Sequence, residues 1–128
     1  MKLTADEAKL VLPGLVQVDL LQLMRAEAAG RPLPSIIAAA QSGLVRYRRA
    51  DPREQWKTYT QLLTDGWGDC EDLAAAVTAE LHLAGDVGAS IHVYLSNPAR
   101  RTHHVVVWSD WWGFLDPSRT AGMGWNEL

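Results

Sequence analysis

The clearest pattern of apolar positions lies in the middle of the chain, where intervals of three and four residues are typical of a helix. The apolar positions are Leu73, Ala74, Val77, Leu81 and Ala84. Gly85 follows them, where glycine commonly ends a helix. Asp69 is placed to cap the first turn, with Asp72 three residues later as its acidic partner. We therefore expect a helix that begins directly after Asp69.

The first thirty residues also have a helical pattern. Thr4 and Glu7 have the spacing of a capping box, and a helix is expected to begin there. Pro13 is placed as proline often is near the start of a helix, and Gly30 follows the last apolar position. The pattern therefore predicts two helices before Gly30.

Between these helices and Asp69 the pattern is weaker. Residues 36–40 are expected to form a short helix that Gly43 ends, and residues 44–47 are expected to be extended. Asp51-Pro52 indicates a turn, and residues 56–63 are assigned weakly to a helix.

In the last third of the chain, residue types change to β-branched and aromatic side chains. Three short strands are expected, over residues 90–95, 102–109 and 113–115, with a hairpin turn near Asp110. The predicted fold class is α+β, with N-terminal helices followed by a cysteine-bearing helix that packs on a small antiparallel β-sheet. A chain of 128 residues suits one domain with one core.

Composition and charge exclude several functions. The formal net charge is −3, which gives no overall electrostatic attraction to nucleic acid or to an anionic membrane. The basic run at residues 46–49 is short and is interpreted as a solvated or ion-paired strand end. No apolar run is long enough to cross a bilayer, and residues 1–7 do not resemble a signal peptide. We expect a cytoplasmic, soluble chain with no nucleic-acid or membrane partner.

Cys70 is the only cysteine, and it stands where the glycine-rich segment 66–69 meets the predicted helix. A single cysteine excludes an internal disulfide and a cysteine-rich zinc site, so any function would lie in its reactivity. The backbone amides and the positive end of the helix dipole would favour the thiolate at this position. The alternative is that Cys70 is a small buried apolar residue and that Asp69 and Asp72 only cap the helix.

Two histidines and an aspartate supply a candidate base for this thiol. His103 and His104 begin the second predicted strand, and Asp116 follows the third, so a hairpin would bring a histidine beside the carboxylate. Because neighbouring strand residues face opposite sides of a sheet, Asp116 can share a face with only one of them. If the hairpin loop has an odd number of residues, His104 shares a face with Asp116, and if the number is even, His103 does. A two-residue turn, the simplest even case, would require a positive φ at Trp111, so the odd case and His104 are favoured.

The sequences G-W-G-D-C-E-D-L-A, H-H-V-V-V-W and L-D-P-S resemble the transglutaminase-like cysteine peptidase superfamily, a rearranged relative of the papain fold. More narrowly, S-G-L-V-R-Y-R-R and D-P-S-R-T-A-G-M resemble small proteins encoded by tailed bacteriophages and prophages. The resemblance covers residues 42–123 and implies a catalytic core there, with residues 1–41 as a helical extension. It implies that Cys70 is the nucleophile, His104 the general base and Asp116 the residue that orients it, and the motif H-V-x-V aligns best with His104.

The expected function is therefore a cysteine hydrolase or acyltransferase that cleaves or transfers at an amide or isopeptide bond through a thioester. Its partner would be a protein or peptide substrate, and it would act in the host cytoplasm or in the virion. The alternative is a non-catalytic structural or assembly protein of a phage particle, with other phage proteins as partners. An RNA- or DNA-binding module built on Tyr47 and the neighbouring arginines lacks a recognisable motif.

Further residues complete the expected site. An oxyanion would need two donors, for which we consider the backbone amide of Cys70 and either the indole of Trp67 or the amide of Gln61. An aromatic concentration is expected near the site, as its core or rim; its members are Trp108, Trp111, Trp112 and Trp125.

The acidic residues around Cys70 are candidate metal ligands. Asp69, Glu71 and Asp72 offer the oxygen ligands that suit calcium, which some periplasmic relatives with a D-C-E-D motif hold. Capping already accounts for two of these acids. We therefore expect no obligatory metal and no cofactor.

Overall fold

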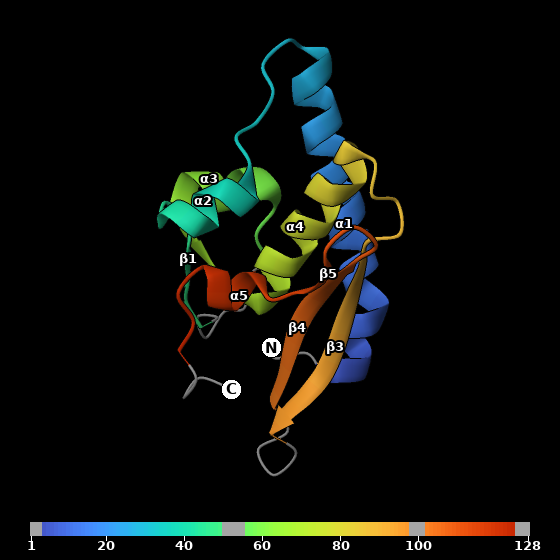
Figure 1. Ribbon diagram of the computed structural model, residues 1–128, viewed down its shortest axis with the longest axis vertical. Helices are drawn as coiled ribbons and strands as arrows, with labels where there is room; N and C mark the ends of the chain where they lie inside the picture. The colour runs from blue at the N-terminus through green and yellow to red at the C-terminus, as the bar shows by residue number, and fades with distance from the viewer. Residues whose placement is uncertain (1–3, 50–55, 98–101, 125–128) are drawn as a thin grey trace.

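The computed structural model describes residues 4–49, 56–97 and 102–124, and it has a mixed α+β fold. The helices are α1 (Ala5–Ala28), α2 (Ile36–Ser42), α3 (Tyr59–Asp65), α4 (Cys70–Ala84) and α5 (Pro117–Thr120). The strands are β1 (Arg46–Tyr47), β2 (Trp67–Gly68), β3 (Ser90–Asn97), β4 (Thr102–Ser109) and β5 (Gly113–Leu115). Helix α4 is central, and it contacts the other four helices and the strands β2, β3 and β4 (Figure 1).

The predicted central helix is confirmed as α4. Asp69 caps it through a reciprocal pair of hydrogen bonds with Asp72, and Gly85 ends it in the left-handed conformation at φ 110°. Residues 71–79 and Leu81 are all buried. Helix α4 therefore lies inside the molecule, covered on several sides, and its first residue is Cys70.

The prediction of two helices before Gly30 is wrong. The capping box of Thr4 and Glu7 is present, but one helix, α1, runs through Pro13 to Ala28. The buried side chains keep one helical register on both sides of the proline; they are Ala8, Leu12, Leu15, Val16, Asp19 and Leu23. Packing of this stripe on α4 and β3 outweighs the hydrogen bond that Pro13 cannot make. Residues of α1 and α2 belong to the same buried core as α4.

The short helix α2 is confirmed, with Ser35 as its cap and Gly43 ending it. A carboxylate from α4 completes its first turn: Glu80 accepts hydrogen bonds from the backbone N–H of Ile36 at 2.7 Å and of Ile37 at 3.2 Å. The hydroxyl of Ser35 donates to the same carboxylate at 2.6 Å. The expected helix over residues 56–63 forms later, as α3, and the expected turn at 51–52 lies outside the described residues.

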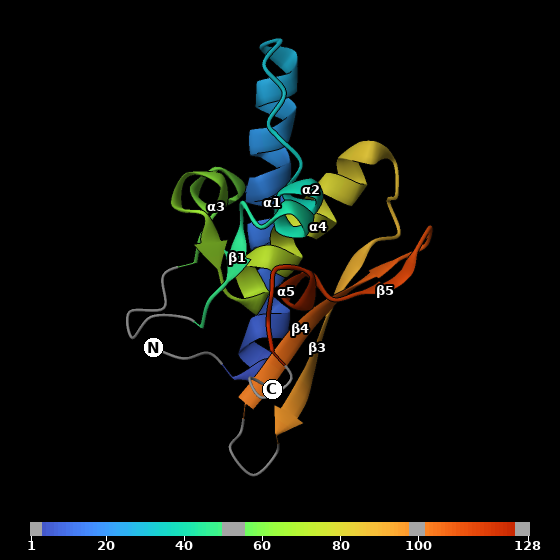
Figure 2. The same cartoon turned by 60° about the vertical axis from the view of Figure 1, so that its left-hand side comes forward.

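The three predicted C-terminal strands form one antiparallel sheet in the order β3-β4-β5. In the β4–β5 hairpin Ser109 pairs with Gly113, so three residues make the loop. The last pair is Val107 with Leu115, after which the chain leaves the sheet and enters α5. The edge of β4 before Val107 is therefore not covered by β5, and Figure 2 shows the tip of this hairpin projecting from the body.

Residues 46–47, expected to be extended, form β1, which pairs in parallel with β2 directly before α4. Gly68 in β2 is buried, and a Cβ added there would overlap the side chain of Leu62 and lie 3.2 Å from Cβ of Asp72. The absence of a side chain at Gly68 thus allows α3, β2 and the first turn of α4 to meet closely.

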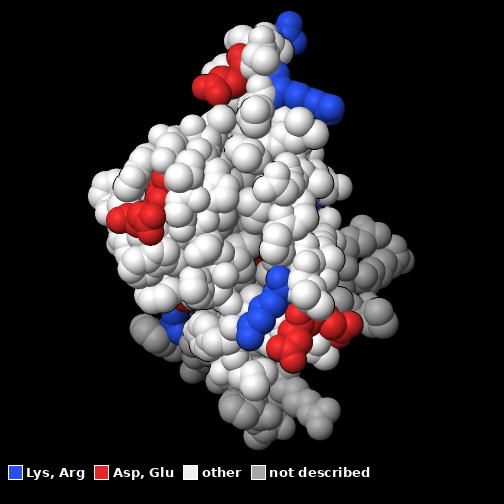
Figure 3. Space-filling model, turned by 90° about the vertical axis from the view of Figure 1, so that its right-hand side faces the viewer, with Lys and Arg blue, Asp and Glu red and all other residues white. Residues whose placement is uncertain are grey.

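One side of the molecule carries few charges. Seen from the right-hand side of Figure 1, a broad uncharged area separates charged groups at its upper and lower ends, with one acidic group at the margin (Figure 3). Among the described residues, no helix has the length and hydropathy required to cross a membrane.

Candidate active site

Cys70 is the first residue of α4, directly after the cap Asp69. Its side chain is partly buried and packs against the core, as the apolar stripe of the helix predicts. The backbone of Val105 in β4 hydrogen-bonds the sulfur. Because β5 pairs with β4 only as far as Val107, this amide lies on the uncovered edge of β4. Cys70 therefore lies at a strand edge, and the residue before Val105 is His104.

The expectation that the helix start favours the thiolate is not supported. Burial raises the pKa of the Cys70 thiol well above its usual range, and the charges of Asp69 and Glu71 raise it further. The hydrogen bond from Val105 acts in the opposite direction but is outweighed. Cys70 is thus a protonated thiol at neutral pH, and a neighbouring base must remove its proton before it can attack.

His104 and Asp116 form the expected pair. The Nε2 atom of His104 lies 3.1 and 3.0 Å from the two carboxylate oxygens of Asp116. The three-residue loop is the odd case, and it places both residues on the same face of the sheet. The imidazole of His104 is buried, with 1% of its side chain exposed, so its orientation is fixed by this contact.

The charge state of Asp116 determines which nitrogen of His104 carries the proton. Burial alone would raise the pKa of Asp116, but the hydrogen bond and charge of His104, together with Arg119, lower it. The Nε of Arg119 lies 3.3 Å from Oδ2 of Asp116. An ionised carboxylate only accepts hydrogen bonds, so Nε2 of His104 must donate and Nδ1 is left as the basic nitrogen.

Tyr94 lies within electrostatic reach of all three candidate residues. Its ring meets the imidazole of His104 edge to face, with centroids 5.6 Å apart. The pKa of its phenol is raised by burial first, then by the charge of Asp116, and also by Cys70. Among the described contacts there is no direct hydrogen bond between Cys70 and His104. Their proximity follows from two other residues. Val105 hydrogen-bonds Cys70 and follows His104 in the chain, and Tyr94 interacts with Cys70 and contacts the ring of His104.

His103 belongs to a different contact, on the face of β4 that is turned toward α4. Its Nε2 lies 2.7 Å from Oε1 of Glu71, and Oε2 of Glu71 accepts a hydrogen bond from the indole of Trp56 at 2.8 Å. As strand alternation predicts, His103 lies on the face opposite His104. The partners Glu71 and Trp56 were not anticipated, although strand alternation combined with the position of Glu71 on α4 could have indicated the first.

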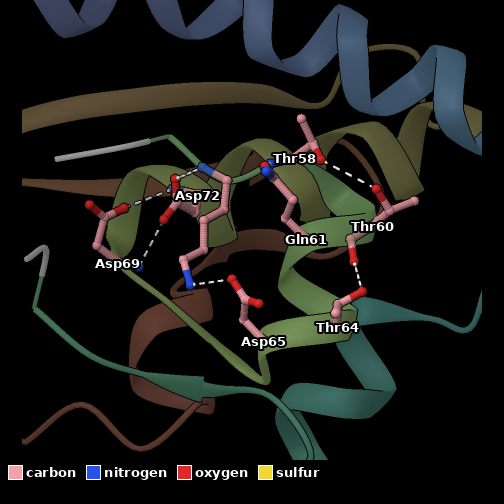
Figure 4. A network of polar contacts seen from close by, with 8 residues as sticks. Thr58, Thr60, Gln61, Thr64, Asp65, Asp69 and Asp72 are labelled. Carbon is pink, nitrogen blue, oxygen red and sulfur yellow. Dashed lines mark hydrogen bonds and ion pairs between the residues drawn. The ribbon is translucent and has the colours of Figure 1, made fainter. Parts of the chain in front are cut away.

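The acids around Cys70 are already engaged with protein groups. Asp72 accepts the backbone N–H of Lys57 at 2.9 Å and that of Asp69 at 3.2 Å, and Asp69 accepts the N–H of Asp72 (Figure 4). Burial raises the pKa of both carboxyls, and their mutual repulsion raises that of Asp72 further, to about 8. Among the described residues, no group of three acidic, histidine or cysteine side chains is arranged to hold a metal.

The two residues considered as second oxyanion donors occupy different environments. Trp67 lies in β2, with the Nζ of Lys57 3.1 Å and the guanidinium of Arg48 4.7 Å from its ring centroid. Gln61 lies in the first turn of α3, where its Oε1 accepts the backbone N–H of Thr58 (Figure 4). These contacts explain the packing of Trp67 and the capping role of Gln61, and the oxyanion role of Trp67 stays a prediction.

The expectation of an aromatic cluster near the site is wrong for the tryptophans that are described. Trp108, Trp111 and Trp112 lie at the exposed tip of the β4–β5 hairpin. A Cβ at Gly85 would lie 3.6 Å from Trp111, which places this ring at the C-terminal end of α4. Cys70 begins the same helix, about 20 Å away at 1.5 Å per residue. Trp125 lies outside the described residues.

Comparison with known proteins adds no assignment. Neither family models, nor curated proteins, nor solved structures gave a match to this chain. The functional argument therefore rests on the arrangement of Cys70, His104 and Asp116.

Proposed function

We propose that this protein is a cysteine hydrolase or acyltransferase that acts on an amide or isopeptide bond through a thioester on Cys70. The observation that supports the proposal most strongly is the buried His104–Asp116 pair beside the strand edge where Cys70 lies. A carboxylate that holds one imidazole nitrogen and leaves the other free beside a thiol is the arrangement that nucleophilic catalysis requires.

The reaction begins with a neutral thiol. Nδ1 of His104 takes the proton from Cys70 as the sulfur attacks the carbonyl carbon of the substrate, because the raised pKa of Cys70 disfavours a preformed thiolate. The new C–S bond gives a tetrahedral oxyanion, and the imidazolium is stabilised by ionised Asp116. Collapse breaks the C–N bond, and the imidazolium returns the proton to the departing amine.

The thioester then reacts with a second nucleophile. Water gives hydrolysis and an amine gives transfer, and His104 deprotonates either one before the thiol leaves with the returned proton. The amide of Cys70, at the start of α4, is our first oxyanion donor, and the indole of Trp67 is the candidate for the second. The sequence resemblance to the transglutaminase-like superfamily and to phage-encoded proteins supports the same chemistry, and the protein or peptide nature of the substrate belongs to this proposal.

Acylation of the intact chain by an activated ester tests the proposal. We expect 4-nitrophenyl acetate to give a burst of nitrophenol and a single acetyl group on Cys70, read by intact-mass spectrometry. Cys70→Ala should abolish the adduct, and His104→Gln and Asp116→Asn should slow its formation at neutral pH by about 10²-fold or more. His103→Gln is the matched control, because it removes a neighbouring histidine on the other face and should retain the burst.

The raised pKa of Cys70 favours a second candidate function, a non-catalytic docking or assembly module. In that case Cys70 is a buried apolar residue and the His104–Asp116 contact ties α5 to the sheet. A docking or assembly module predicts no acetylation of Cys70 in the folded chain. His104→Gln would then lower the stability of the chain without a selective loss of Cys70 reactivity.

A further inference from the structure

Helix α1 is apolar on two opposite sides. One side packs into the core, and the other exposes a second apolar stripe, the outer face of α1, which consists of Leu10, Val11, Gly14, Gln17, Val18, Leu21 and Met24. Leu10 is 83% exposed and Met24 52%. A helix that packs on one side only normally carries polar residues on the other, so this stripe has the composition of a contact surface.

Gly14 opens the middle of this stripe. A Cβ added at Gly14 would meet no atom within 4 Å, so no packing within the described chain requires the glycine. Glycine in a helix interior costs about 1 kcal/mol relative to alanine. A second helix that approaches closely over Gly14 would use the missing side chain.

The charged residues at the two ends of the outer face are complementary to those of a second copy of α1 that runs in the opposite direction. Glu7 and Arg25 lie on one line along the exposed side of α1, beyond the two ends of the apolar stripe, because the helix makes about five full turns between them. In an antiparallel pair of helices related by a two-fold axis, this line meets the same line of the partner with its ends reversed. Glu7 then faces Arg25 of the second copy at each end of the pair.

We propose that the outer face of α1 binds a second copy of this chain as an antiparallel helix pair, with the two-fold axis near Gln17. Leu21 of each copy packs over Gly14 of the other, and Leu10 lies beside Met24. A parallel pair would bring the two Glu7 side chains to one end and the two Arg25 side chains to the other, so this pair of charges favours the antiparallel arrangement.

The expected dimer is weak. The outer face, from Leu10 to Met24, is about 22 Å long and about 10 Å wide, and its footprint of a few hundred Å² is smaller than the area of a permanent dimer. A reversible equilibrium that depends on protein concentration follows. The acidic and basic ends should also make it weaker in high salt.

Sedimentation equilibrium of the full chain across protein concentration tests the association. We expect dimerisation at tens to hundreds of micromolar, weakened at least tenfold by Leu21→Glu. The matched control is Leu44→Glu, because Leu44 is 76% exposed in the connection between α2 and β1 and is not part of the outer face of α1, so this substitution should leave the equilibrium unchanged. A chain that is monomeric at every concentration, or a dimer that Leu21→Glu does not weaken, would overturn the proposal.

Disulfide cross-linking tests the orientation in a Cys70→Ala background. Gln17→Cys, at the proposed axis, should form a covalent dimer under mild oxidation, whereas Leu10→Cys should not, because its copies lie at opposite ends of the pair. Efficient cross-linking of Leu10→Cys to itself would show a parallel pair and contradict the proposal. Circular dichroism of each variant confirms that the helices are retained, so a loss of cross-linking is read only from folded protein.

Discussion

The carboxyl group of Asp19 is fully buried in the side of α1 that faces the core. Oδ1 accepts the backbone N–H of Tyr59 at 2.8 Å, and Oδ2 has no hydrogen-bond partner in the described structure. Burial raises the pKa of this group from 3.8 to about 7, against the effect of the Tyr59 hydrogen bond. The folded chain therefore holds a proton that the unfolded chain releases, and stability falls as the pH rises through this interval.

Asp19→Asn should remove this pH dependence, because asparagine keeps the acceptor for Tyr59 and cannot ionise. Relative to the wild type, the free energy of unfolding of the variant should increase as the pH rises from 3.8 to about 7, by at most about 1.4 kcal/mol per pH unit. Urea unfolding at a series of pH values measures the difference. Parallel stability profiles for the two proteins would show that Asp19 is ionised in the folded state.

Gly68→Ala should destabilise the chain, because the new methyl group would overlap Leu62 and press on Asp72. A loss of about 1–3 kcal/mol is expected for overpacking of this kind. Gly14→Ala is the control, since its methyl group meets no neighbour and should stabilise α1 slightly in the monomer. Thermal melts at low protein concentration measure both, and an unchanged melting temperature in Gly68→Ala would contradict the close packing before α4.

Among the elements, α2 is held at its first turn chiefly by a carboxylate from α4. Glu80 accepts two backbone N–H groups of α2, the hydroxyl of Ser35 and the hydroxyl of Tyr59. Glu80 therefore accepts the backbone N–H groups at the start of a helix of seven residues, which has too few internal hydrogen bonds to be stable alone.

Glu80→Ala should lower the free energy of unfolding by about 2–4 kcal/mol, because buried donors of α2 lose their acceptor. Glu80→Gln keeps one acceptor oxygen and should lose less. Amide hydrogen exchange provides the decisive reading: α2 should exchange faster in the alanine variant while β4 stays protected. Uniform destabilisation without local exchange in α2 would argue against this anchoring role.

The sequence predicted those parts of the fold that depend on local chemistry. The caps at Thr4 and Asp69 and the glycine stops at Gly43 and Gly85 follow from the hydrogen bonding of a few neighbouring residues. The pairing of His104 with Asp116 was also accessible, because strand alternation converts loop length into a choice of face. These predictions needed no knowledge of distant contacts.

The rest depended on tertiary packing. Pro13 lies inside α1 because the buried stripe continues past it, and the pattern alone could not weigh this packing against the proline. The tryptophans of the hairpin are distant from Cys70 because β4 runs from His104 to a hairpin tip beside the C-terminal end of α4. The pKa of Cys70 is raised, contrary to the sequence prediction, because burial and the two flanking acids outweigh the effect of the helix start.

For the whole molecule, the central claim is that His104 activates Cys70. The site joins a helix start, a strand edge and the turn into α5, so it exists only when all three elements are assembled. A thiol with a raised pKa is unreactive at neutral pH unless an adjacent base removes its proton.

The rate of alkylation of Cys70 by iodoacetamide across pH tests this claim most directly. We expect wild type to react already at neutral pH, because His104 removes the thiol proton, and to be about 10²-fold faster there than His104→Gln. The variant should react only as the pH approaches the raised thiol pKa, so the two profiles converge at high pH. Superimposable profiles for wild type and His104→Gln would contradict the account.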